Sequence, residues 1–278
     1  MTSPAPRGPD EFRFGLIPLG TGVTLHYAEK GEKAGTPVLF LHGYADSWRS
    51  FAEVIETLPR EYRAVAIDLR GHGDSDKPEC CYAVEDFAQD LLLFMDALGL
   101  HKANLVGHSM GSFIAQSLAV RCPGRVERLV LVSSAPGTAG NAVLLEIKPR
   151  IDALRDPIGR NFATEFQAPS NPVSAGFMET IVSETMKVPA HVWRAAFSGL
   201  LQVNHGPILR YINAPTLIVW GNQDQIFTRQ DQEVLLSEIP HSRLEQFDAG
   251  HALHWEKPRE MAEALETFCA EAGRNSTR

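Results

Sequence analysis

The amino-acid sequence predicts an α/β fold built on a mostly parallel sheet. Short apolar runs alternate with stretches of helical periodicity along most of the 278 residues. These runs are apolar throughout, as expected of strands that helices cover on both faces. Loops rich in glycine and polar residues follow several of the runs. Because functional groups gather at the carboxyl ends of parallel strands, these loops are where a site is expected.

The strands are predicted in chain order from apolar runs that turn residues bound. The first two runs form a hairpin across Gly20-Thr21-Gly22, and the later runs are expected to be buried. The runs are Phe12–Leu19, Val23–Glu29, Pro37–Leu41, Tyr62–Leu69, the run that begins at Asn104, Val126–Ser133, Thr216–Trp220 and Arg243–Phe247.

Helices are predicted between the strands from apolar residues that recur on one face. The first follows Asp46 or Ser47, either of which can cap it, and runs to about Leu58. The others are Val84–Leu98, the stretch after Ser109, Arg229–Glu238 and Pro258–Ala270.

Between Pro136 and Ala214 the alternation stops, because strand-like runs are missing there. Helical stretches take their place near Ala142–Leu154, Pro172–Lys187 and Pro189–Gln202. The sequence therefore predicts a core formed by residues 1–135 and 215–278. Residues 136–214, called the cap segment below, are predicted to be a helical insertion.

Composition limits the kind of partner that the protein has. Hydrophobic content of 44% and charged content of 22% are ordinary for a soluble globular protein, and the net charge of -8 argues against nucleic acid or anionic membrane as a partner. No run is long enough to span a bilayer, and the first ten residues lack the apolar part of a signal peptide. Four cysteines make no disulfide framework, so free thiols and a cytoplasmic location are expected. The histidines lack metal-ligand spacing, so no metal is expected.

The stretch from Asn104 to Ile114 contains Gly-X-Ser-X-Gly between a predicted strand and a predicted helix. Gly107 and Gly111 remove side chains that would crowd a tight turn, which would lift the Ser109 hydroxyl above the sheet edge. Such a match also arises by chance, and a serine before a helix is often only an N-cap. The rest of the chain must decide between these readings.

A serine nucleophile needs a base, and the base needs a group that orients it. Two later strand ends supply a carboxylate at Asp224 and an imidazole at His251, in the chain order Ser, Asp, His. Taken singly, Asp224 could be a turn residue and His251 a loop residue. The strand after Ser109 ends in Ser133-Ser134-Ala135 and offers no acid. The other histidines considered are expected to pack or to hold loops, namely His72, His108 and His254.

An attacked acyl group becomes an oxyanion, which needs N–H donors fixed in advance. The backbone N–H of Met110, at the start of the predicted helix, is one candidate. The second is the N–H of Tyr44, because Gly43 allows the loop after Pro37–Leu41 to come close.

Together these motifs resemble the α/β-hydrolase superfamily. They are His-Gly-Tyr-Ala-Asp-Ser-Trp, Asp-Leu-Arg-Gly-His-Gly-Asp-Ser, Gly-His-Ser-Met-Gly, Trp-Gly-Asn-Gln-Asp and Ala-Gly-His. The resemblance implies the α/β-hydrolase fold, an eight-stranded, mostly parallel sheet flanked by helices, whose second strand is antiparallel. It also implies an inserted helical cap and no cofactor. It makes Ser109 the nucleophile, His251 the base and Asp224 the group that orients the base.

The first of these motifs is most similar to the branch of epoxide hydrolases and haloalkane dehalogenases. That branch uses an aspartate nucleophile where this chain has Ser109, and its epoxide hydrolases use cap tyrosines where the cap segment has only Tyr211. An esterase or lactonase is therefore favoured, with a medium-sized hydrophobic acyl group as substrate. Trp193, Phe197 and Ile226 are the expected pocket residues. The protein is expected to be a monomer or a small homo-oligomer.

Two alternatives stay open from sequence. The same triad serves hydrolases of amides or of carbon–carbon bonds, and sequence separates these poorly from esterases. A small-ligand receptor on the same fold is less favoured, because all three triad residues are present.

Overall fold

The computed structural model describes residues 10–271 and contains an eight-stranded sheet in the order β1-β2-β4-β3-β5-β6-β7-β8. Strand β2 is antiparallel to both of its neighbours, and every other pair is parallel. This confirms the sheet expected from the resemblance. The strands are β1 Arg13–Pro18, β2 Thr24–Lys30, β3 Thr36–Leu41, β4 Tyr62–Ile67, β5 Ala103–His108, β6 Val126–Val132, β7 Thr216–Gly221 and β8 Ser242–Phe247.

Helices cover both faces of the sheet, because successive strand residues point to opposite sides. In β3, Val38 and Phe40 join one buried cluster with α1 (Ala52–Thr57) and α10 (Pro258–Ala270). Leu39 and Leu41 join the cluster on the other face. That cluster also includes residues of α2 (Val84–Ala97), α3 (Met110–Arg121) and α8 (Arg229–Glu238). The central strands are thus apolar on both faces, as the sequence predicts.

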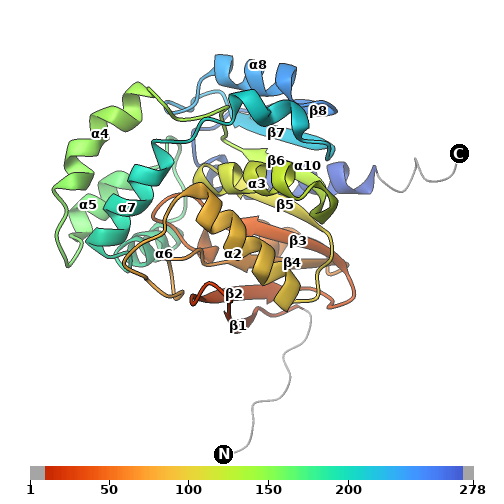
Figure 1. Cartoon of the computed structure of the whole chain (residues 1–278), viewed down its shortest axis with the longest axis horizontal. Coiled ribbons are helices and arrows are strands. Elements are labelled where there is room, and N and C mark those ends of the chain that lie inside the picture. Colours follow the sequence, from red (N-terminus) through yellow and green to blue (C-terminus); the bar gives the residue numbers. More distant parts are fainter. Residues whose placement is uncertain (1–9, 272–278) are drawn as a thin grey trace, which may run out of the picture.

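The cap segment carries four α-helices, which Figure 1 shows together at one end of the sheet. Its described backbone meets a strand-like partner only at the isolated bridge between Gly137 and Asn204, near the two ends of the segment. Its division from the core as a separate domain stays a prediction. The elements are α4 Ala142–Asp152, α5 Arg160–Phe166, α6 Ala175–Thr185, α7 Ala190–Leu200 and the 3-10 helix η3 Gly206–Tyr211.

The helix bounds differ from the sequence-based expectations at a few points. Helix α6 begins at Ala175, because the Ser174 side chain caps it by accepting from Phe177 N–H. The helix predicted after Asp46 or Ser47 is present as η1 (Trp48–Phe51) followed by α1. The short helices α5, η2 (Pro123–Arg125), η3 and α9 (Leu253–Glu256) were not predicted. Within residues 10–271 no helix has the length and apolar character to cross a membrane. The expectations for the first nine residues and for the tail after Glu271 fall outside the described residues.

Candidate active site

Ser109 lies at the abrupt turn between β5 and α3. Its φ of 49° and ψ of -116° are unusual for a residue with a side chain, and the turn holds them because Ser109 N–H donates to Val132 O of the neighbouring strand at 3.0 Å. A Cβ at Gly111 would lie 2.2 Å from Leu41 O, so only glycine lets α3 start this close to β3. The serine is half-buried and lines a cavity.

His251 and Asp224 meet at the ends of β8 and β7. Nδ1 of His251 donates to Oδ2 of Asp224 at 2.9 Å. The second carboxylate oxygen, Oδ1, accepts the backbone N–H groups of Ile226 at 2.8 Å and of Phe227 at 3.1 Å. The Asp224 side chain is wholly buried, whereas 22% of the His251 side chain is exposed. Asp224 therefore fixes the imidazole orientation, and Nε2 is the ring nitrogen left for chemistry in the cavity that Ser109 also lines.

The loop after β3 comes close to Ser109. A Cβ at Gly43 would lie 2.8 Å from His108 Nδ1 and 3.5 Å from Ser109 Cβ. The ring of His42 fixes this loop, since its Nε2 accepts from Leu69 N–H at 3.0 Å and its Nδ1 donates to Gly43 O at 2.7 Å. Burial lowers the pKa of His42 to about 4, which keeps this neutral tautomer in place.

The two expected oxyanion donors come from the loop after β3 and from the start of α3. Because a trans peptide points its C=O and N–H in opposite directions, the bond that holds Gly43 O directs the Tyr44 N–H away from the His42 ring. Met110 is the first residue of α3, so its N–H has no partner within the helix. The Tyr44 side chain is anchored separately, since its hydroxyl donates to Trp193 O at 2.5 Å.

The competing histidines have structural contacts. His108 is buried, its pKa is well below the ordinary histidine value because of burial, and its Nε2 donates to His251 O at 3.1 Å. His254 is also buried, and its Nε2 lies 2.8 Å from Ser50 Oγ. His72 lies in the loop after β4, where Nδ1 donates to Arg70 O at 2.8 Å. Each agrees with its expected packing or loop-holding role.

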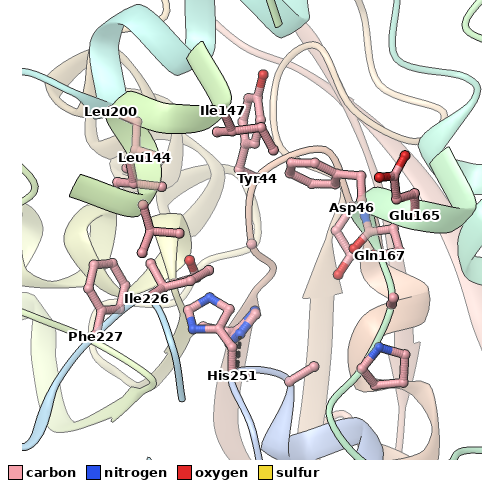
Figure 2. Close-up of a pocket in the computed structure, with 18 of the residues that line it drawn as sticks. Tyr44, Asp46, Leu144, Ile147, Glu165, Gln167, Leu200, Ile226, Phe227 and His251 are labelled. Atoms are coloured by element: carbon pink, nitrogen blue, oxygen red, sulfur yellow. Dashed lines mark hydrogen bonds between the residues drawn. The ribbon is translucent and has the colours of Figure 1, made fainter. Parts of the chain in front are cut away.

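The cavity beside Ser109 and His251 has a volume of about 340 Å³ and is lined by both core and cap segment. Figure 2 shows Leu144, Ile226 and Phe227 on one side of it, while Asp46, Glu165 and Gln167 lie on the other. The mainly apolar lining is typical of a small-molecule pocket.

Two of the three expected pocket residues, Phe197 and Ile226, line this cavity, whereas Trp193 does not. The expectation for Trp193 was wrong because its ring is wholly buried between the cap segment and Tyr44 of the core, at a ring distance of 5.1 Å from Tyr44. There it contacts Phe162 and Phe166 at ring distances of 5.3 Å and 4.9 Å. Of α7, the cavity reaches Phe197 and Leu200, and Trp193 lies about one turn before Phe197, toward the N-terminus of the helix.

Sequence reasoning missed the charged part of the lining. Asp46 was read as a possible helix cap, but Ser47 caps η1 by accepting from Arg49 N–H, and Asp46 faces the cavity. Arg150 and Glu165 also line it, on helices α4 and α5. Only the His-Gly-Tyr-Ala-Asp motif gave a signal for Asp46, and nothing in the local pattern marked the other two.

One group of possible metal ligands occurs among the described residues, namely His26, Asp68 and Asp74, whose ligand atoms lie within 4.8 Å of one another. Sequence spacing did not reveal it. The three residues already hold one another and their surroundings: His26 Nδ1 donates to Asp68 Oδ2 at 2.8 Å, and Asp74 binds Lys187 at 2.9 Å. Asp68 also accepts the Trp48 N–H. This arrangement fixes the loop after β4.

The profile of the alpha/beta hydrolase fold family matches residues 36–258. The chain belongs to this family. Among curated relatives, a putative 2-succinyl-6-hydroxy-2,4-cyclohexadiene-1-carboxylate synthase of Bacillus subtilis is 30% identical over 91% of this chain and 97% of its own. A 3-oxoadipate enol-lactonase 2 of Acinetobacter baylyi is 26% identical over 88% and 92%.

Solved structures support the same fold. An esterase from Exiguobacterium antarcticum has a TM-score of 0.83 with 23% identity, over 91% of this chain and 98% of its own. At that identity the likeness concerns the fold. Membership of this family supports a hydrolase that acts on a small molecule.

Proposed function

We propose that the chain is a serine hydrolase that cleaves a carboxylic ester or lactone with a medium-sized hydrophobic acyl group. The observation that carries this proposal is the bond between His251 Nδ1 and Asp224 Oδ2 at a cavity that Ser109 also lines. The apolar part of that cavity supports an apolar acyl chain. The reaction as proposed needs no cofactor.

In the proposed mechanism, Ser109 Oγ attacks the acyl carbonyl while His251 Nε2 accepts the hydroxyl proton. The N–H groups of Tyr44 and Met110 stabilise the oxyanion. Collapse of this intermediate breaks the bond to the alkoxy group, which takes the proton from His251 and leaves an acyl-enzyme. Water then attacks the acyl-enzyme, with His251 again accepting a proton, and the acid is released as Ser109 regains its hydrogen.

The test is Ser109→Ala, assayed with p-nitrophenyl esters of increasing acyl length. Turnover should fall by up to ~10⁶-fold, as in other serine hydrolases that lose a triad member. The matched control is Ser133→Ala, at the end of the neighbouring strand β6, where the buried hydroxyl has no hydrogen-bond partner. The control should keep its activity. Full turnover in a purified Ser109→Ala enzyme would refute the mechanism, and an amide substrate preferred over every ester would refute the bond class.

A further inference from the structure

The cavity contains one ion pair at its polar side. Arg150 on α4 and Glu165 on α5 form a two-pronged contact, with Nη2 to Oε2 at 2.6 Å and Nη1 to Oε1 at 3.2 Å. The Arg150 guanidinium also lies 5.5 Å from the centre of the Phe162 ring. Glu165 raises the pKa of Arg150, and Arg150 lowers the pKa of Glu165, so both groups stay charged. This contact uses two of the five guanidinium N–H donors, on the edge formed by Nη1 and Nη2, so a carboxylate can bind that edge only by displacing Glu165.

Arg150 is the sole lysine or arginine among the described residues that line the cavity. Other polar donors on the same side are already used. The amide nitrogen of Gln167 donates to Ala45 O at 3.2 Å and to Thr185 Oγ1 at 2.8 Å, and these two bonds use both of its hydrogens. A carboxylate on a substrate would therefore meet no free side-chain amide there, and it would meet a cation whose charge is paired and whose Nη1–Nη2 edge is occupied by Glu165.

Asp46 adds an acidic group to this side. The side chain is buried at the cavity wall, and its Oδ1 accepts the Ser47 N–H at 2.8 Å. It is either neutral or negative, so it offers a carboxylate substrate nothing better than a hydrogen bond, and repulsion once it ionises. Negative charge on a substrate is thus opposed by Glu165, and also by Asp46 once Asp46 is ionised.

We infer that Glu165 is a specificity-determining residue: by holding Arg150, it makes the cavity select uncharged esters or lactones over those that carry a carboxylate. This inference rests on the proposed function and specifies its substrate class. Glu165 acts by binding the Arg150 guanidinium edge that a substrate carboxylate would otherwise bind. The inference therefore predicts that removing the charge of Glu165 creates a carboxylate-binding site where the native cavity has none.

The experiment compares two esters that differ mainly in one carboxylate, p-nitrophenyl hexanoate and mono-p-nitrophenyl adipate. The native enzyme should have the higher kcat/KM for the hexanoate. Glu165→Gln should raise kcat/KM for the adipate ester relative to the hexanoate by about two- to fivefold, which is the range that exposed ion pairs support. The double variant Arg150→Met, Glu165→Gln should lose that gain. Added salt should also reduce the gain, because the contact is exposed to solvent.

The matched control is Glu179→Gln, because Glu179 forms an ion pair with Arg160 within the cap segment but does not line the cavity. It should leave the ratio of the two esters unchanged. The inference would be overturned, and the proposed function left standing, if the native enzyme hydrolysed both esters with equal kcat/KM. The same holds if the ratio of kcat/KM for the adipate ester to that for the hexanoate were equal in Glu165→Gln and in the native enzyme. Hexanoate turnover that persists in Ser109→Ala, or no ester turnover at all, would overturn both.

Discussion

Two aspartates at the cavity illustrate how surroundings set the role of a carboxyl group. Asp224 accepts three hydrogen bonds, from the His251 ring and from two backbone N–H groups, and these bonds fix its carboxylate beside the ring that it orients. Asp46 is equally buried, but burial outweighs the hydrogen bonds from Ser50 and Ser47 and raises its pKa to about 7. The nearby carboxylates of Glu184 and Asp68 also raise the pKa of Asp46. The same type of side chain therefore orients a histidine ring at one position and, at the other, has a pKa that burial raises to about 7.

Asp46→Asn should change how stability depends on pH. The pKa of Asp46 is raised from 3.8 to about 7 by folding, so the native protein holds this proton more tightly than the unfolded chain. The stabilisation is therefore complete below about pH 4 and is lost as pH rises to about 7. Asparagine does not titrate. As pH rises from about 5 to about 8, the unfolding free energy of the variant should therefore increase by roughly 2–3 kcal/mol relative to that of the native protein.

Urea unfolding of both proteins at the two pH values measures this difference. Asp248→Asn is the control, because Asp248 is an exposed aspartate on the loop after β8. The difference in unfolding free energy between this variant and the native protein should be the same at both pH values. A native-to-Asp46→Asn difference that is the same at both pH values would show that Asp46 does not titrate in this range.

At the scale of elements, helix α7 serves two surfaces with residues one turn apart. Trp193 lies in an aromatic cluster that the cap segment forms with Tyr44 of the core, whereas Phe197 reaches the cavity. Trp193→Ala should therefore lower the unfolding free energy by about 3–5 kcal/mol and leave the ratio of kcat/KM for long and short acyl esters unchanged. Phe197→Ala should shift that ratio by about tenfold, since one methylene is worth ~1–3 kcal/mol in an apolar pocket.

Unfolding curves and an ester series on the two variants give both readouts. If Trp193→Ala is too unstable to assay, Trp193→Leu keeps more of the packing. It should lower the unfolding free energy by a smaller amount and also leave the chain-length ratio unchanged. A shift in chain-length preference that follows Trp193 and not Phe197 would contradict the assignment of the two faces.

The elements also separate what the sequence could predict from what it could not. The strands and the long helices α8 and α10 follow from local periodicity, and the turn at Ser109 follows from its glycines. Helices α5 and α9 are too short to give a periodic signal. The four-residue spacing of Trp193 and Phe197 predicts a shared face correctly, but that face meets the cap interior at one residue and the cavity at the other. The contact between Arg150 and Glu165 depends on how two helices pack, which no local pattern records.

Across the whole molecule, Glu256 links the cap segment to the loop that carries His251. Its Oε2 accepts Gly250 N–H at 2.9 Å and the Asn171 side-chain amide at 2.5 Å, while Oε1 accepts Ser170 N–H at 3.1 Å. Asn171 also donates to Gln223 at 3.1 Å, beside Asp224. One carboxylate thus connects a loop of the cap segment with both strand ends that position the base. A second link, from Lys187 to Asp74, is exposed and lies elsewhere on the core.

Glu256→Ala should therefore disturb the chemistry more than the packing. Without the Glu256 carboxylate, the loop around Asn171 and the loop that carries His251 lose their connection, so His251 is held less firmly. Displacements of about 1 Å in a catalytic group can cost 10²-fold in rate. We expect kcat to fall by about tenfold or more for every ester, with the chain-length ratio unchanged and with faster proteolysis of the loop around Asn171. Lys187→Met, which removes the exposed link, should change unfolding free energy by less than about 1 kcal/mol and leave kcat near native. If Glu256→Ala instead alters chain-length preference at constant kcat, the carboxylate shapes the cavity and does not support the base.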